Sequence, residues 1–307
     1  MIKATRLRNG ARFRLVTVAA AVAGAVAALA TPALASTSAA NTSAGYPPPG
    51  GIYKPFTNCP LNNPYMHEDE VGNFGGAACI AATAPSGTIT LGNITTPVTE
   101  AVHVQFAFAS NPGFTNYPLP AYPPLAGPSA ILKTKPDVIP GTLTDALSCA
   151  TATDATIQNL CQQLVTHPEY NTVTALAQEA GNLRNFNLFD WVQPVKFKLI
   201  NPLLGSNCYI GSDENPVVLH PSLSLGPGGS LTGAQDPEPT LHPDTLVLAL
   251  TGAVASDSSF SAPGVLGCGP GGSADVAVDE ALDAGAGLPA ASGNSLTLNG
   301  SFLVAAN

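Results

Sequence analysis

The clearest signal in the chain is a two-residue alternation of apolar and polar side chains. In VHVQFAF, apolar residues occupy every second position from Val102 to Phe108, with His103 and Gln105 between them. The same alternation recurs in GTITLGN (87–93) and VKFKLIN (195–201). This pattern is typical of strands that bury one face.

Three further apolar runs follow towards the C-terminus, separated by clusters of Gly, Pro, Asn and Asp. They are PVVLHPSLSLG (216–226), TLVLALTGAV (245–254) and SLTLNGSFLVA (295–305). Short strands between turn-rich segments predict a mainly β fold, an antiparallel β-sandwich.

Residues 141–183 change to a helical pattern and predict a small helical insertion in the sandwich. Asp154 is suited to cap a helix whose apolar residues recur at helical spacing. These apolar residues are Ile157, Leu160, Cys161 and Leu164. Pro168 ends that helix, and we expect a further short helix that closes at Gly181.

The segments before the helical pattern are rich in proline. Residues 112–140 contain eight prolines, which predicts a long extended loop. Tyr117 and Tyr122 in this loop offer a ligand platform, although packing onto the sandwich is the commoner outcome. Residues 36–55 are rich in Pro, Gly and Ser and predict a disordered linker. A single β-rich domain is expected over 56–307.

Residues 1–35 have the organisation of a secretory signal peptide. Basic residues precede the apolar run LVTVAAAVAGAVAALA (15–30), and Ala33-Leu34-Ala35 offers a small-x-small cleavage site. We therefore expect a secreted protein, extracellular or loosely associated with the cell surface, with no membrane span after cleavage.

The net charge narrows the range of partners. The full chain carries −9, and five of its eleven basic residues lie in the expected leader, so the mature protein is more acidic still. Such a field repels nucleic acid and anionic lipid headgroups. We expect no nucleic-acid partner, and a cell-envelope or extracellular protein or glycan of unknown identity instead.

Six cysteines lie in the expected mature part, and an even number in an exported protein predicts disulfides. We expect pairing in sequence order, because each neighbouring pair is separable as a local unit. The expected bonds are Cys59–Cys79, Cys149–Cys161 and Cys208–Cys268. The spacing never gives C-x-x-C, which argues against zinc and thioredoxin-like chemistry.

Two stretches, NPLLGSNCYIG (201–211) and CGPGGSADVAVDEALDAGAGLPAASGNSLTLNGSFLVA (268–305), resemble a family of secreted, disulfide-bonded actinobacterial proteins with no assigned activity. The resemblance covers residues 195–307 well and the region from Cys59 to Cys79 loosely. It implies a β-rich, exported, disulfide-bonded protein.

Candidate catalytic or metal-binding groups are few. The nucleophile motif G-x-S-x-G is absent, and the acidic run HEDE (67–70) lacks the second histidine of H-E-x-x-H. His167, His220 and His242 each precede a proline, which indicates extended backbone at a turn or strand end. We expect no cofactor, no metal and no catalytic residue.

Two acidic clusters have structural interpretations. Cys208, Asp213, Glu214 and His220 lie close together in sequence, and we interpret them as a disulfide anchor followed by a solvated turn and a strand. A second cluster at helical spacing, Asp275, Asp279 and Asp283, indicates one face of a short amphipathic helix.

Two classes of function remain open. The first is a non-catalytic extracellular or cell-surface module with a binding or structural role. Within it, glycan binding is weakened because Trp191 is the only tryptophan. The second is a secreted hydrolase whose catalytic residues are dispersed in sequence. A concave site that gathers histidine and carboxylate side chains would favour the second class.

Overall fold

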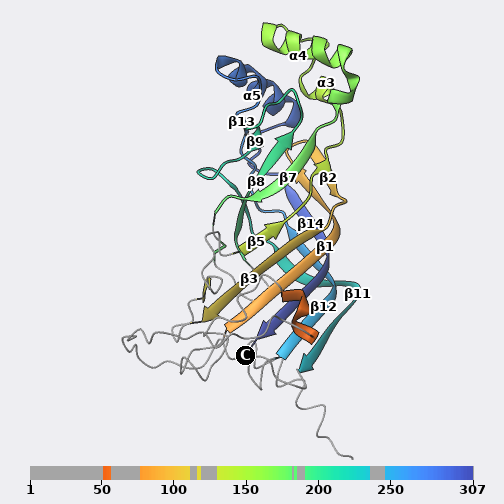
Figure 1. The fold of residues 1–307 in the computed structure, drawn as a ribbon, viewed down its shortest axis with the longest axis vertical. Helices are drawn as coiled ribbons and strands as arrows, with labels where there is room; N and C mark the ends of the chain where they lie inside the picture. Colours follow the sequence, from red (N-terminus) through yellow and green to blue (C-terminus); the bar gives the residue numbers. More distant parts are fainter. Residues whose placement is uncertain are drawn as a thin grey trace, which may run out of the picture.

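The fold consists of two antiparallel β-sheets and a group of helices at one end of the molecule, as expected for the predicted β-sandwich with helices (Figure 1). The computed structural model describes residues 51–56, 77–110, 116–118, 130–181, 183–184, 191–235 and 246–306.

The larger sheet has eight strands and contains the longest strands of the chain. In spatial order they are β11 (Ser222–Gln235), β12 (Leu246–Asp257), β14 (Ser295–Ala306), β1 (Ala77–Leu91), β3 (Val102–Ser110) and β4 (Asn116–Pro118), with β2 (Ile94–Val98) paired to β1 and β5 (Ala130–Lys133) paired to β3.

The second sheet has six shorter strands. In spatial order they are β13 (Val265–Leu266), β9 (Tyr209–Ile210), β8 (Gln193–Ile200), β7 (Thr174–Glu179) and β6 (Asp137–Val138), with β10 (Val217–Leu219) paired to β8.

Strand β8 shows how the alternating pattern builds the second sheet. Val195, Phe197 and Leu199 are buried, as the sequence predicts. Lys196 and Lys198 point the other way, and both ammonium groups lie over the ring of Tyr209, at 5.4 and 5.9 Å from its centroid. The long lysine side chains thus cover the outer face of the sheet while their charges stay near water.

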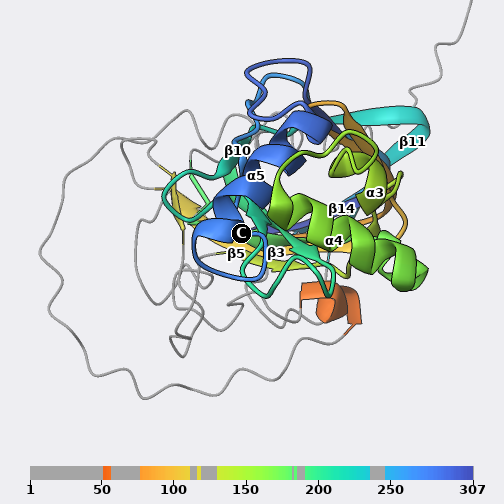
Figure 2. The ribbon, with the colours of Figure 1, turned by 90° about the horizontal axis from the view of Figure 1, so that it is seen from above.

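Helices α3 (Leu143–Ala146), α4 (Ala155–Thr166) and α5 (Ser273–Ala286) lie together at one end of the molecule (Figure 2). As predicted, Asp154 caps α4, because its carboxylate accepts the N–H groups of Thr156 and Ile157. The buried side chains of α3 and α4 belong to the same apolar cluster as β8 and α5. The predicted helical insertion is therefore part of the main core rather than a separate lobe.

The helix expected to close at Gly181 is not formed. The segment Thr174–Glu179 is strand β7, paired with β8 on one side and β6 on the other. All six residues are half-buried. By pairing with both neighbours, β7 satisfies backbone N–H and C=O groups of β6 and β8 that would otherwise lack partners. Tertiary pairing here overrides the helical preference of an Ala-rich segment.

Residues at the end of the predicted linker are also ordered against the sheet. The linker was expected to run to residue 55, but Gly51–Phe56 form the 3₁₀-helix η1. The side chain of Phe56 is buried, and the Pro55 carbonyl accepts a hydrogen bond from Gln105 Nε2 at 2.9 Å. Burial of one aromatic side chain thus ends the linker earlier than its composition indicates.

Two of the expected disulfides are present among the described residues. Cys149 is bonded to Cys161 with a Cα–Cα distance of 5.6 Å, and Cys208 to Cys268 with 4.2 Å. Cys79 is also disulfide-bonded. Its expected partner Cys59 lies outside the described residues, as do the signal peptide, residues 36–50, the HEDE run, Tyr122 and His242.

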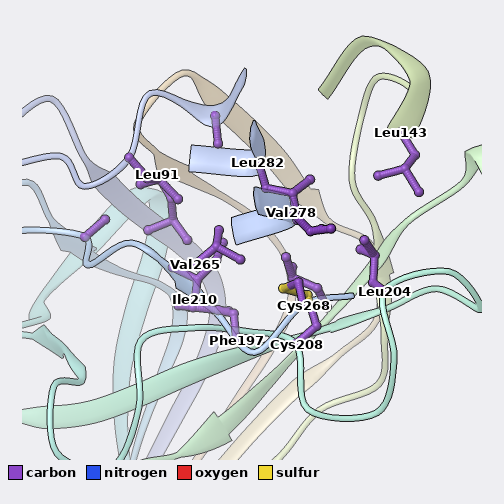
Figure 3. Close-up of a cluster of buried hydrophobic side chains, with 14 of the residues drawn as sticks. Leu91, Leu143, Phe197, Leu204, Cys208, Ile210, Val265, Cys268, Val278 and Leu282 are labelled. Carbon is purple, nitrogen blue, oxygen red and sulfur yellow. A yellow bond between two sulfur atoms is a disulfide. The ribbon is translucent and has the colours of Figure 1, made fainter. Parts of the chain in front are cut away.

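The Cys208–Cys268 bond lies inside the larger apolar cluster, between Phe197 of β8 and Val278 of α5 (Figure 3). Gly267 precedes Cys268 with a φ of +72°, and a Cβ there would lie 2.5 Å from the Asn207 carbonyl oxygen. Only glycine fits this position, which explains why a glycine precedes Cys268.

The acidic residues of α5 accept hydrogen bonds from the backbone of residues 265–271, which precede the helix. Asp279 accepts the N–H groups of Gly267 and Cys268 at 2.9 and 2.8 Å. Asp283 accepts the Val265 N–H at 2.6 Å, and Asp275 accepts the Gly271 N–H at 2.7 Å. The predicted helix is present, but its acidic face binds backbone donors instead of being only solvated.

These contacts predict unequal effects of removing the two disulfides. Replacing both Cys208 and Cys268 with Ala should lower the free energy of unfolding by about 4 kcal/mol, because their separation is 60 residues. The Cys149 and Cys161 double variant should lose about 3 kcal/mol for a separation of 12 residues. Urea unfolding followed by circular dichroism measures both. A larger loss of unfolding free energy for the Cys149 and Cys161 variant would contradict the expectation that the Cys208–Cys268 bond contributes more to stability.

Candidate functional site

The candidate site is a cavity of about 130 Å³ between the two sheets. One wall comes from β1, β2, β3, β5 and β14 of the larger sheet, and the other from β6 to β10 of the second sheet. Most of the lining is aliphatic. Its apolar side chains include Ile89, Leu91, Val98, Val104, Leu132, Val195, Phe197, Leu219, Leu296 and Leu298.

The cavity exists because small side chains face it from β7. Ala175 and Ala177 lie opposite Leu199 and Phe197 on the neighbouring strand, and both alanines line the space. The surrounding aliphatic residues belong to two sheets whose strands are fixed by backbone pairing. The walls therefore cannot close over the space that the two alanines leave.

Gln193 is the most deeply buried polar side chain in this mainly apolar lining. Gln193 is only 4% exposed and continues the buried row of β8, two positions before Val195. Its Nε2 donates to the Pro194 carbonyl oxygen at 3.3 Å. Its Oε1 is fully buried and has no hydrogen-bond partner, and it is the single such side-chain atom in the part of the chain that the structure describes.

Trp191 lines the cavity near Gln193 and belongs to the core. It is 6% exposed and packs against Phe106 and Phe302, with ring centroids 6.3 and 6.0 Å away. Its buried position removes it as an exposed stacking platform for sugars. It also makes the only tryptophan of the chain a local reporter of the cavity.

Polar groups join the two sheets along the edge of the cavity. The Glu179 carboxylate of β7 accepts the Leu132 N–H of β5, and Thr134 Oγ1 donates to the Ala177 carbonyl at 2.9 Å. Burial raises the pKa of Glu179, although the hydrogen bond from Leu132 acts in the opposite direction. These bonds hold β5 against β7 beside the alanines that form the cavity.

A second polar group closes the edge near β6. Asp137 Oδ1 accepts hydrogen bonds from the N–H and hydroxyl of Thr99 and from the N–H of Glu100, at 2.7 to 3.0 Å. Lys135 pairs with Glu100 at 2.9 Å, and both side chains are largely exposed. The charged residues at this edge thus already have protein partners.

Asp257 anchors the wall formed by Leu219 and Pro221. Its Oδ2 accepts the His220 N–H at 2.6 Å, and its Oδ1 accepts both the N–H and the hydroxyl of Ser259 at 2.8 Å. Burial alone would raise the pKa of Asp257, but these hydrogen bonds and the neighbouring His220 together lower it.

The acidic and histidine cluster noted around Cys208 does not form a site. Cys208 is in the disulfide, and Asp213 pairs with Lys196 Nζ at 2.7 Å. Glu214 is exposed in the expected turn, which Ser212 and Asn215 close by hydrogen bonds. His220 contributes its backbone N–H to Asp257, so Cys208, Asp213 and His220 each make a different structural contact.

The other described histidines are also separate. His103 Nδ1 lies 3.1 Å from Thr83 Oγ1 on an exposed face, and no described carboxylate bonds to its ring. His167 bonds to Glu169 and stacks on Tyr170 after the end of α4. Within the described ranges, no three His, Cys, Asp or Glu side chains are close enough to hold a metal ion.

Comparison with known proteins gives no relative. No protein-family model matches the chain, and neither a curated protein nor a solved structure is significantly similar to it. The resemblance to secreted actinobacterial proteins therefore stays a prediction. None of the described helices combines the length and the apolar character needed to cross a bilayer.

Gln193 is the site residue that the sequence interpretation missed. The alternation in VKFKLIN begins at Val195, and a glutamine two positions earlier continues the same face of the strand. A polar residue in the register of a buried row is a usable signal. This signal is easily overlooked because Pro194, between Gln193 and Val195, suggests that the strand has not yet begun.

The contacts of Asp257 predict a pH dependence of stability. A carboxylate whose pKa is lowered in the folded state stabilises the protein above its unfolded pKa, near 3.8, and loses that effect as pH falls through its folded pKa. Replacing Asp257 with Asn should lower the unfolding midpoint at pH 6. The difference in unfolding midpoint between the wild type and Asp257→Asn should become smaller below about pH 4.

Thermal unfolding measured between pH 2.5 and 7 tests this expectation. Asp213→Asn is the matched control, since it removes a surface ion pair and should cost less than about 1 kcal/mol at any pH. A gap between wild type and Asp257→Asn that stays constant down to pH 2.5 would contradict the assignment.

Proposed function

We propose that the protein is an exported, non-catalytic binding protein that holds a small apolar molecule between its two sheets. One observation carries the proposal: the aliphatic cavity between the sheets, whose lining includes the buried side chain of Gln193. Ligand sites are typically concave and mostly apolar, with a few polar groups that fix orientation.

The size and composition of the cavity support an apolar ligand. An engineered cavity of about 150 Å³ lined by Leu, Ile and Phe stays dry and binds benzene. The space here is about 130 Å³ and has a similar aliphatic lining. An apolar molecule that moves from water into such a space gains the free energy of its buried surface.

Export is supported by the leader expected at residues 1–35 and by the disulfides, which form and persist in oxidising compartments. Binding without catalysis is supported by the separate structural contacts of Asp213 and His220 and by the exposed position of Glu214. The alternative of a secreted hydrolase needs a histidine and a carboxylate that converge beside a nucleophile. No specific observation among the described residues favours it over binding.

Binding of benzene-sized probes tests the proposal. Benzene and methylcyclohexane should bind the wild type with dissociation constants on the order of 0.1–1 mM, about 4 to 5.5 kcal/mol. Binding should shift the emission of Trp191. At ten times its dissociation constant, each probe should raise the free energy of unfolding by about 1.4 kcal/mol.

Ala177→Leu should abolish both effects, because the larger side chain occupies the cavity. It should leave the stability of the free protein unchanged or raise it by about 0.5–2 kcal/mol, as cavity-filling substitutions do. Ala155→Leu, at an exposed position of α4, is the matched control and should bind both probes as the wild type does. The proposal is wrong if neither probe binds, or if Ala177→Leu binds them unchanged.

A further inference from the structure

Resting on the proposed function, we infer that the ligand is an aliphatic amine, with its alkyl part in the cavity and its ammonium group beside the carboxylate of Asp137. Asp137 lies in the segment that joins the two sheets at the edge of the cavity. The inference rests on the face of β6 that carries Asp137, the oxygen that its hydrogen bonds leave free, and the sign of the charges around it.

The lining of the cavity reaches solvent at residues 132–139, which run from β5 of the larger sheet to β6 of the second sheet. The residues of this segment that line the cavity are Leu132, Thr134, Lys135, Asp137 and Ile139. Lys135 is the only exposed residue in the described part of the lining, whereas Val195 and Phe197 of β8 are buried. A polar group of a bound ligand therefore keeps its hydration only near residues 132–139.

The strand register places the Asp137 side chain on the inner face of the second sheet. Asp137 lies opposite Ala175 of β7, and Ala175 lies opposite Leu199 of β8. Directly opposite residues of antiparallel strands share a face, and this face carries the buried Leu199 and the cavity-lining Ala175. Val138, the next residue of β6, points to the outer face and is 56% exposed. The Asp137 carboxylate thus lies on the side of the cavity.

The hydrogen bonds of Asp137 leave one carboxylate oxygen free. Oδ1 accepts all three, from the N–H and hydroxyl of Thr99 and from the N–H of Glu100. Oδ2 accepts none from the described residues. It is not a buried atom either, since Gln193 alone has a buried, unpartnered side-chain atom in the described ranges. An ionised carboxylate oxygen only accepts hydrogen bonds, and an ammonium group is a strong donor because the bond is charge-assisted.

Negative charge predominates at this edge of the cavity. The charge of Lys135 is already balanced, because its ammonium group pairs with Glu100 at 2.9 Å. Glu179 lies on the same inner face of β7 as the alanines that line the cavity. No described cation pairs with Asp137 or Glu179, and burial raises the pKa of Glu179. This field attracts a ligand cation and repels a ligand carboxylate.

The cavity determines the rest of the ligand. A space of about 130 Å³ with an aliphatic lining accommodates a short alkyl segment or a six-membered ring. Each CH₂ group that moves from water into this lining strengthens binding about fourfold. The ammonium group alone would gain only an exposed ion pair, which contributes little. The alkyl part therefore supplies most of the affinity, and the amine supplies the orientation and the specificity.

Three probes with the same hexyl chain test the choice of head group: hexylammonium, 1-hexanol and hexanoate. At pH 7 and low salt, the wild type should bind hexylammonium about tenfold more tightly than hexanoate, with 1-hexanol between them. Ethylammonium carries the same charge on a much shorter chain and should not bind measurably. Calorimetry and the emission of Trp191 measure all four affinities.

Asp137→Asn isolates the contact with the head group. Asparagine keeps the Oδ1 atom that accepts the three hydrogen bonds, and it replaces Oδ2 with an NH₂ group that cannot accept one. The preference for hexylammonium over hexanoate should fall from about tenfold to less than about threefold. Glu214→Gln is the matched control, because it removes an exposed carboxylate outside the lining and should keep the preference.

Equal affinities of the wild type for hexylammonium and hexanoate would overturn the inference. Tighter binding of hexanoate would also overturn it, and would assign the head group to Lys135. A tenfold preference that persists in Asp137→Asn, or that is lost in Glu214→Gln, would show that general charge attraction selects the amine instead of Asp137. If the asparagine variant does not fold, Ala177→Leu serves as the second test: it should abolish hexylammonium binding, and unchanged binding would overturn the inference.

Failure of this inference is distinguishable from failure of the proposed function. If methylcyclohexane binds and Ala177→Leu prevents it, the cavity is a binding site even where the hexyl probes show no preference for the amine. The amine alone is then wrong. If neither methylcyclohexane nor any hexyl probe binds, both the inference and the proposed function are wrong.

Discussion

The bond between Cys208 and Cys268 joins the second sheet to the loop before α5, and the larger apolar cluster is built around it. Both cysteines are fully buried, and the Cys208 carbonyl accepts a hydrogen bond from the Leu199 N–H of β8 at 2.9 Å. Strand β8 is thus hydrogen-bonded to a segment that the disulfide joins to the loop before α5. Because β8 forms part of one wall of the cavity, the fold itself holds this wall in place, and the proposed ligand would not have to order it on binding.

Much of the fold follows from local patterns in the sequence. The alternation around Val195 and Phe197 identifies a strand with one buried face, and Asp154 identifies the start of α4. These features depend on residues within a few positions of one another, where backbone geometry alone decides which side chains share a face. The same holds for α5, whose buried residues Val278 and Leu282 recur at helical spacing.

The remaining features depend on contacts between distant segments. Thr174–Glu179 has a helical composition and becomes a strand because β6 and β8 supply backbone partners on both sides. The cavity likewise needs Ala177 and Leu298, which are far apart in sequence, to line one space from two sheets. The local pattern could suggest that Gln193 is buried, but not that it lines a cavity, because the other lining residues come from distant segments.

The carboxylates of α5 hold the preceding segment through hydrogen bonds from its backbone N–H groups. Asp275, Asp279 and Asp283 all accept backbone N–H groups, and these donors are the same whatever side chain the loop carries. Exposed positions such as Leu266 and Pro270 are therefore free to vary, whereas Gly267 is not. The exposed side chains of this loop can therefore change while the hydrogen bonds that join its backbone to α5 stay the same.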